Sequence, residues 1–356
     1  MIKLKNSIYT CNICLTISFN NIIEKILIFE KSKITLMISE TLIYILSIIV
    51  ISVIIDMIIG EVPDKIHPVI FMGNMISKLK DILPPTKFSG LLIVLTTIFT
   101  FSAITVIILM ITAMINTLLF IVVASIILST TFSINYLIQT VKGIQNDLKE
   151  DINKARKSMS YLVSRNTEEL TESRITSAAI ETLTENITDS VVSPLFYTSI
   201  FGLFPYGLIT SIVVVVIYRV SNTMDAMLGY KTKELAQIGY IPAILDDILN
   251  YIPARITGLY VILAAFILRY DYKQSFDVMK KYARKTPSPN SGYSMSAAAG
   301  ALNITLVKEG VYKLGYGDDE LTSDKITEAI SLTKVTSLLF ILTIVLVYII
   351  LIFLLL

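Results

Sequence analysis

The sequence predicts an all-α, polytopic membrane protein with about five to six transmembrane helices joined by helical cytoplasmic loops. Three observations predict this class: 54% of the 356 residues are hydrophobic, only 16% are charged, and the mean hydropathy is +0.72. Soluble domains carry roughly 25% charged residues, so this chain cannot cover a water-facing surface. Two cysteines are too few for a disulfide scaffold, and a net charge of +2 does not indicate a nucleic-acid-binding protein.

Five apolar regions account for the predicted crossings, since a helix needs about 20 apolar residues to span a bilayer. They are residues 37–59, 90–138, 191–217, 251–268 and 337–356. Region 90–138 is long enough for two crossings, with Asn116 and Thr117 as the expected turn between them. Region 191–217 is interrupted by prolines and glycines, region 251–268 is marginal, and region 337–356 is an uncharged C-terminal anchor.

The polar loops set the expected orientation of the chain. Loops 60–89, 139–190 and 269–336 are rich in Lys and Arg, and such loops face the cytoplasm. Simple alternation would place loop 218–250 outside the cell. A broken or re-entrant helix in region 191–217 would return that loop to the cytoplasmic side, because irregular backbone is tolerated where it lines a cavity. Both topologies stay open at this point.

The N-terminal segment differs from the rest of the chain. Residues 1–36 contain short, Asn-interrupted apolar runs with scattered lysines, and they hold both cysteines, Cys11 and Cys14. The segment lacks the clean apolar core of a signal peptide, and its C-x-x-C lacks the second pair of a zinc site. We expect a non-catalytic extension over residues 1–36 and a single integral-membrane domain over residues 37–356.

An acidic stripe is the first candidate functional feature. Residues 171–190 contain no helix breaker, and Glu181, Glu185 and Asp189 follow at intervals of four, which places them on one helix face. Like charges at this spacing destabilise a helix by about 0.2–0.5 kcal/mol per pair, so a lysine, an arginine or a metal ion should offset them. A solvated face explains the spacing at least as well, but the stripe leads directly into apolar region 191–217, which favours a site.

Two further clusters of oxygen-bearing side chains lie beside apolar regions. Asn222 and Asp225 share a helix face, and the adjacent Asp246 and Asp247 precede Asn250 by four and three residues. Carboxylate and amide oxygens suit Mg²⁺ that also binds substrate phosphates. A helix cap beside a snorkelling arginine is the alternative interpretation of the second cluster.

Two other features carry weaker signals. The Pro-Ser-Pro-Asn-Ser-Gly turn over residues 287–292 precedes a run of small residues, and a helix start of this kind presents backbone N–H groups to an anion. A close-packed helix joint is an equally good interpretation. His67 is the only histidine; it has the chemistry of a general base or a phosphate donor, although a structural role is more common for a lone histidine.

Taken together and in this order, the motifs resemble the adenosylcobinamide-phosphate synthase family (CbiB/CobD) of cobalamin biosynthesis. The matching stretches are D…G-E-x-P…H-P-V in residues 56–69, S-R-N-T in 164–167, E-T-L-T-E-N-x-x-D…P-L-F-Y in 181–197, N-T-M-D-x-M-x-G-Y-K in 222–231, D-D-x-x-N-Y-I-P-A-R in 246–255 and S-P-N-S-G in 288–292. The resemblance extends from about residue 40 to residue 317. Asn166 stands where the family has Asp, so no carboxylate is available there, and Tyr293 stands where an indole is frequent.

The resemblance implies a late step of cobamide assembly. The family attaches (R)-1-aminopropan-2-yl phosphate, or a related amino-alcohol phosphate, to the last free propionate of adenosylcobyric acid in an ATP-dependent reaction that yields adenosylcobinamide phosphate. The expected partners are the corrinoid, the amino-alcohol phosphate and the lipid bilayer, and association with other enzymes of the pathway is compatible with the sequence. The expected location is the cell membrane, with the active site on the cytoplasmic side.

Residue chemistry suggests a role for each candidate. Carboxylates are expected to bind Mg²⁺, or a similar divalent cation, with ATP as cosubstrate: Glu181, Glu185, Asp189, Asp225, Asp246 and Asp247. Cationic, amide and turn residues are expected to hold and orient phosphates: Arg165, Asn186, Arg219, Asn222, Lys231, Asn250, Arg255, Ser288, Asn290 and Gly292. The base for the attacking ammonium is expected among His67, Glu181, Glu185 and Asp225.

Three other functions stay open at this stage. A prenyl- or phosphatidyl-transferase also uses Asp pairs with Mg²⁺ at a membrane, but Asp246 and Asp247 lack the third Asp of D-D-x-x-D. A transporter for corrinoid intermediates would place its acids in mid-helix facing a cavity, whereas here they concentrate in loops and at helix boundaries. A non-catalytic membrane scaffold is the third alternative.

Overall fold

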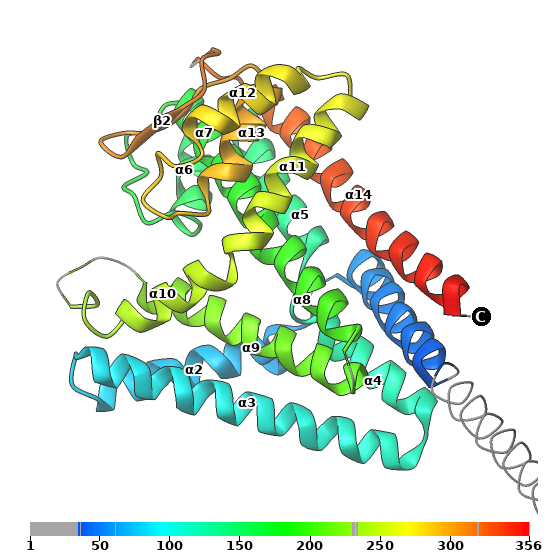
Figure 1. Cartoon of the computed structure of the whole chain (residues 1–356). Helices are drawn as coiled ribbons and strands as arrows, with labels where there is room; N and C mark the ends of the chain where they lie inside the picture. The colour runs from blue at the N-terminus through cyan, green and yellow to red at the C-terminus, as the bar shows by residue number, and fades with distance from the viewer. Residues whose placement is uncertain are drawn as a thin grey trace, which may run out of the picture.

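The computed structural model describes residue 35 and residues 37–355, apart from residues 61, 205, 230, 231, 233 and 319. Within this part of the chain, five helices are long and apolar enough to cross a membrane, or six if a bent helix pair counts as one span. The predicted class, an all-α polytopic membrane protein, is confirmed (Figure 1). The predicted extension over residues 1–36 lies outside the described residues except for residue 35.

The membrane-length helices agree with most of the predicted crossings. They are Met37–Ile58, α3 (Lys87–Ile115), the continuous stretch Thr117–Glu150 of α4 (Thr117–Ser129) and α5 (Ile134–Glu150), α9 (Gly207–Leu228) and α14 (Asp324–Leu355). The turn predicted at Asn116 is confirmed, because its Oδ1 accepts a hydrogen bond of 2.7 Å from the backbone N–H of Leu119 and caps α4. Large apolar side chains such as Phe99 and Leu346 stand exposed along α3 and α14, as expected for lipid-facing helices.

The apolar region 191–217 is not a single crossing. It contains a π-helical turn η2 (Thr188–Val192), then α8 (Ser193–Gly202), then a tight turn at Tyr206 with φ 60°, and it continues into α9. The turn is tight because a Cβ on Gly207 would lie only 2.4 Å from the carbonyl oxygen of Gly202. The predicted interruption is therefore real, but the predicted end at residue 217 is wrong, since α9 extends to Leu228.

The bent helix pair follows the hairpin. It consists of α10 (Tyr240–Leu249) and α11 (Tyr251–Ile267), which meet at Asn250 at an angle of 47°. The predicted crossing 251–268 corresponds closely to α11. After it come α12 (Tyr272–Tyr282) and α13 (Gly292–Ala301), whose small residues are buried.

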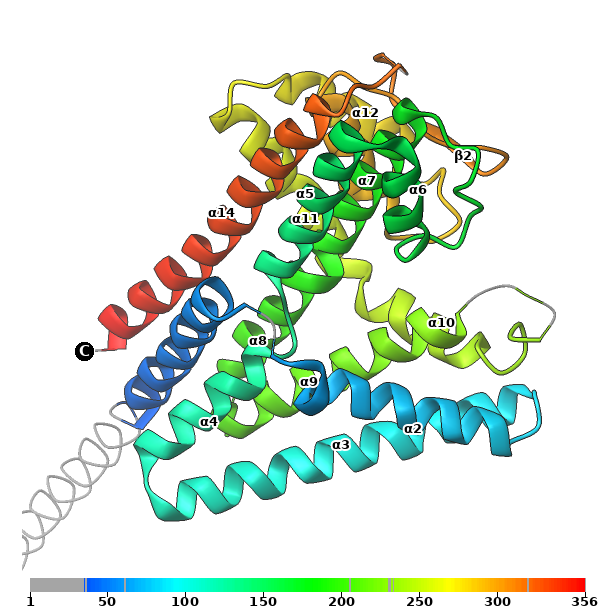
Figure 2. The same cartoon turned by 180° about the vertical axis from the view of Figure 1, so that it is seen from behind.

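The remaining elements complete two groups of helices. Near the start of the chain lie η1 (Asp64–Ile66) and α2 (Pro68–Ile82), which packs with α3 and α9 around a small apolar core. The second group contains α6 (Ile152–Ser160), α7 (Glu172–Ile187) and an antiparallel pair of short strands, β1 (Leu306–Lys308) and β2 (Tyr312–Leu314). Figures 1 and 2 show α2, α3, α9 and α10 side by side in one group, and α6, α7, α12 and α13 with the strands in the other.

Candidate functional site

A cavity of about 410 Å³ lies where the end of α7, the end of α9, α10 and the loop before α13 meet. Five carboxylates contribute to its lining: Glu185, Asp189, Asp225, Asp246 and Asp247. The other polar lining residues are Ser164, Thr188, Asn250, Ser288, Asn290, Ser291 and Lys308. Three clusters that are far apart in the sequence therefore converge on one cavity, which includes five of the six predicted metal ligands.

The end of α7 brings the first two carboxylates to the cavity. The helix begins at Thr171, whose hydroxyl accepts a hydrogen bond from the backbone N–H of Arg174, and it ends by widening into the π-helical turn η2 at Thr188. π-helical turns inside helices are frequent at functional sites, because they shift the direction of the following side chains. Glu185 and Asp189 line the cavity on either side of this transition.

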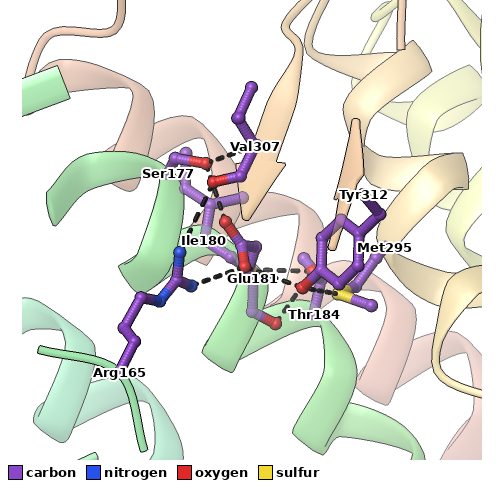
Figure 3. Close-up of polar contacts among 8 residues, drawn as sticks. All are labelled: Arg165, Ser177, Ile180, Glu181, Thr184, Met295, Val307 and Tyr312. Carbon is purple, nitrogen blue, oxygen red and sulfur yellow. Dashed lines mark hydrogen bonds and ion pairs between the residues drawn. The ribbon is translucent and has the colours of Figure 1, made fainter. Parts of the chain in front are cut away.

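Glu181, the first acid of the predicted stripe, lies elsewhere. Its buried carboxylate pairs with Arg165, with Nη2 and Oε2 2.7 Å apart, and it accepts hydrogen bonds of 2.8 Å from the hydroxyls of Ser177 and Tyr312 (Figure 3). Neither Glu181 nor Arg165 lines the cavity. The arginine that offsets the stripe is thus present, and it joins Glu181 in a structural ion pair beside the site.

Asn222 connects the α8–α9 hairpin to α10. Its Nδ2 donates to Asp189 Oδ2 at 3.2 Å and to Asp246 Oδ1 at 3.4 Å, and its Oδ1 accepts from Arg219 Nη1 at 3.4 Å. A single amide therefore holds two of the cavity carboxylates together. One turn further along, Asp225 packs over Gly229, where a Cβ would lie 2.1 Å from Asp225 Oδ1, so this position has room only for glycine.

Asn250 occupies the bend between α10 and α11. Its Oδ1 accepts from the hydroxyls of Ser193 at 2.6 Å and Tyr218 at 3.0 Å, and its Nδ2 donates to Asp246 Oδ2 at 3.0 Å. The residue is 2% exposed. Although Asn250 lines the cavity, its amide is used within the protein, and its visible effect is to position Asp246.

The loop over residues 287–291 closes the cavity on the side of α13. Ser288 Oγ donates to Asp247 Oδ1 at 3.2 Å, and Asn290 Nδ2 donates to the backbone carbonyl of Asp247 at 2.8 Å. Asn290 Oδ1 in turn accepts from Arg255 Nη1 at 3.1 Å. Gly292 lies so close to Ala283 that a Cβ would meet its carbonyl oxygen at 2.2 Å, which is the close-packed helix joint that the sequence left as an alternative.

Several predicted residues do not line the cavity. The Arg255 guanidinium stacks 3.4 Å from the ring centroid of Tyr251 and 4.3 Å from that of Tyr293. His67 is buried, and its Nδ1 accepts a hydrogen bond of 3.2 Å from the backbone N–H of Val69 and caps α2. Asn186, which donates to the carbonyl of Thr182, and the bridging pair Arg219 and Asn222 also lie outside the lining, as do Gly292, Glu181 and Arg165. Lys231 lies outside the described residues.

Comparison with known proteins shows the family to which this chain belongs. Residues 49–349 match the family described as CobD/Cbib protein. The chain belongs to the CobD/CbiB family. It is 44% identical over 294 residues to the "Probable cobalamin biosynthesis protein CobD" of Methanothermobacter thermautotrophicus. The aligned region covers 83% of this chain and 95% of that relative. Proteins of the same name from Methanococcus aeolicus and Methanocaldococcus jannaschii are 43% and 40% identical, each over 76% of this chain and 88% of the relative.

Family membership confirms the resemblance drawn from the ordered motifs, and it places this CobD/CbiB protein in cobalamin biosynthesis. The matched region contains every residue that lines the cavity. No solved structure matches the chain.

Burial and neighbouring charges shift the pKa of two carboxylates in the CobD/CbiB cavity. Burial raises the pKa of Glu185; Lys308 opposes this rise and Glu181 adds to it. Burial raises the pKa of Asp189 well above its ordinary value, with further contributions from the charges of Asp246 and Glu185. A divalent cation in the cavity would oppose both shifts, because a nearby positive charge stabilises the ionised carboxylates that burial destabilises.

The donor set suits magnesium, although it is not arranged as a closed cage. Among the described residues, no three His, Cys, Asp or Glu side chains are already placed to hold a metal ion. Mg²⁺ at phosphate-transfer sites is usually held by one or two carboxylates together with substrate phosphates. The cavity fits this open arrangement, with Asp189, Asp225, Asp246 and Asp247 as the available oxygen donors.

Lys308 and Thr188 are among the polar lining residues that the sequence analysis did not predict. Lys308 lies in β1, a strand of three residues with no alternating pattern that would have predicted it. Thr188 lies next to the acidic stripe, but nothing in the sequence distinguishes its hydroxyl from the many other hydroxyls of apolar helices. Only the fold brings these two side chains to the acids.

Proposed function

We propose that this CobD/CbiB protein is an ATP-dependent ligase that joins an amino-alcohol phosphate to the free propionate of adenosylcobyric acid and so forms adenosylcobinamide phosphate. The observation that carries the proposal is the convergence of five carboxylates, from three ordered sequence motifs, on one cavity beside membrane helices. We also propose that the cavity opens to the cytoplasm, where ATP is available.

The size of the cavity limits what it can hold. A volume of about 410 Å³ lies at the lower end of the range for drug-sized ligands. It accommodates the propionate arm, the amino-alcohol phosphate and the transferred phosphate group, whereas the corrin ring is too large and would stay at the opening. The protein therefore needs to recognise mainly the reacting groups inside the cavity.

The chemistry requires an activated carboxylate. The propionate oxygen attacks the γ-phosphorus of ATP, which forms an acyl phosphate and releases ADP, or the α-phosphorus, which forms an acyl adenylate and releases diphosphate. The amine then attacks the acyl carbon, the C–N bond forms, and phosphate or AMP leaves with the former propionate oxygen. A base must take the proton that the attacking ammonium loses.

The residues of the cavity supply positioning and charge compensation for these steps. Asp189, Asp225, Asp246 and Asp247 would hold Mg²⁺, which when bound neutralises phosphate charge. The raised pKa of Glu185 makes its carboxylate a stronger base than an exposed one, and proton acceptance is most efficient when that pKa approaches the working pH. His67 caps α2 and does not line the cavity, so a cavity carboxylate is the better candidate for the base.

Two isosteric variants test the proposal. Asp225→Asn and Asp246→Asn each remove one negative charge from the cavity, and amide formation should fall on the order of 100-fold, the usual cost of losing one group that stabilises charge in the transition state. Asp277→Asn is the matched control, because Asp277 is an exposed acid on α12 away from the lining. Folding is checked by the melting temperature. Near-wild-type turnover by both cavity variants would show that these carboxylates do not serve the reaction.

A further inference from the structure

Lys308 contributes a positive charge to a cavity whose other charged lining residues are acids. Among the described residues of the lining, it is the only Lys or Arg, and it shares the cavity with five carboxylates. Its charge acts directly on Glu185, whose pKa it lowers. An ammonium group in this place either compensates an acid of the protein or holds an anion that enters the cavity.

The strand that carries Lys308 is fixed to α7 by several polar contacts. The backbone N–H of Val307 donates to Ser177 Oγ at 3.0 Å, and the carbonyl of Val307 accepts from Arg165 Nη1 at 3.4 Å (Figure 3). Across the hairpin, Tyr312 pairs with Lys308 in the strand register and donates its hydroxyl to Glu181. The Arg165–Glu181 ion pair thus holds β1 in place. Glu181 precedes Glu185 on α7 by about one helical turn.

Thr188 provides a second, independent observation. The residue lines the cavity and is only 4% exposed, and its buried hydroxyl has no hydrogen-bond partner within the described part of the chain. The neighbouring Thr184, in contrast, donates to the carbonyl of Ile180 at 2.7 Å. A buried hydroxyl without a partner costs free energy unless a ligand or water satisfies it.

We propose that Lys308 and Thr188 form a phosphate-binding subsite in the wall of the cavity that also carries Glu185. This inference rests on the proposed ligase function and assigns a position within it. The ammonium and the hydroxyl both donate hydrogen bonds, as a phosphate dianion requires. The carboxylates would hold the cation, so a magnesium phosphate complex would find partners for both of its charges in one cavity. The phosphate belongs either to the amino-alcohol phosphate or to ATP, and both sources share this chemistry.

The test measures binding separately from turnover. Aminopropanol phosphate and ATP-Mg²⁺ are titrated calorimetrically into the purified full-length protein, and KM and kcat are measured for each substrate. Lys308→Met keeps the length of the side chain and removes the charge. It should weaken binding and raise KM about 10-fold or more for one of the two substrates, because a hydrogen bond to a charged group is lost. The substrate that is affected identifies the source of the phosphate. Thr188→Val should weaken binding of the same substrate by a smaller factor.

Control variants separate ligand binding from a structural role. Lys308→Arg keeps the charge and should restore most of the affinity. Lys313→Met alters an exposed lysine on the same hairpin, outside the lining, and should leave both Kd values unchanged. Unaltered Kd and KM for both substrates in Lys308→Met would overturn the subsite. If the wild-type protein bound both substrates but formed no amide, the ligase function would be wrong. The Kd values of the variants would still decide whether the subsite binds phosphate.

Discussion

The bend at Asn250 offers the sharpest prediction about how the site is held together. Asn250→Leu replaces the amide by an apolar group of similar size and leaves three partners without it: the hydroxyls of Ser193 and Tyr218 and the carboxylate of Asp246. Leaving a buried polar group unsatisfied costs about 1–3 kcal/mol. The cost should be smaller for Tyr218, which keeps its hydrogen bond of 3.3 Å to the carbonyl of Asp189. It should also be smaller for Asp246, which still accepts a hydrogen bond from Asn222.

Asn250→Leu should lower the free energy of unfolding by about 3 kcal/mol in total. Most of this loss should come from Ser193 and from incomplete compensation at Tyr218 and Asp246. For a chain of this size such a loss should lower Tm by about 5 °C or more. The assay is thermal unfolding in detergent followed by far-ultraviolet circular dichroism, because the protein is largely helical and has no Trp for fluorescence.

Asn186→Leu is the matched control. Asn186 makes one hydrogen bond of 2.8 Å, to the carbonyl of Thr182 in its own helix, and it is partly exposed. Its loss should cost less than about 1 kcal/mol. Equal melting temperatures for the two variants would refute the reasoning that Asn250 joins α8, α9 and α10 at the site.

Two further outcomes are expected. Because burial raises the pKa of Glu185 and Asp189, folding favours their protonated forms, and their contribution becomes more destabilising as pH rises above the ordinary values of about 4. In a chelator, this contribution makes Tm lower near about pH 8 than near about pH 5, and Asp189→Asn should reduce that difference; an unchanged difference would contradict the assignment. For sidedness, Thr232→Cys in a Cys11→Ser, Cys14→Ser background should react with an impermeant maleimide only from the cytoplasmic face, since Thr232 is exposed. Labelling from outside intact cells would contradict a cytoplasmic site.

The crossings could be predicted from the sequence because they depend on local composition. A helix in a bilayer requires a continuous apolar run, and the turn at Asn116 follows from its side-chain capping. The α8–α9 hairpin could not be decided in the same way. Whether Gly202 and Gly207 kink a helix or reverse it depends on tertiary contacts, such as the hydrogen bond of Tyr218 to the carbonyl of Asp189.

The strand pair was missed because almost nothing local encodes it. Each strand has three residues, and the turn contains Gly310 with φ 68°. Its attachment comes from Ser177 and Glu181 on α7, which lie about 130 residues earlier in the chain. Contacts of such long range leave no periodic signal in the sequence.

The sequence predicted that most of the cavity carboxylates lie together, but it did not predict their partners. Spacing correctly grouped Glu185 with Asp189, since the face of a helix is a local property. It also grouped Glu181 with them, but Arg165 and Tyr312 draw that carboxylate into contacts outside the cavity. Lys308 was missed for the same reason as its strand.

The central claim is amide formation by the purified protein. The wild-type protein in detergent or nanodiscs is incubated with adenosylcobyric acid, aminopropanol phosphate, ATP and Mg²⁺, and the corrinoid products are identified by mass spectrometry. We predict adenosylcobinamide phosphate with equimolar release of ADP or AMP, and no product when ATP or Mg²⁺ is omitted. Absence of the amide with folded, substrate-binding protein would contradict the account.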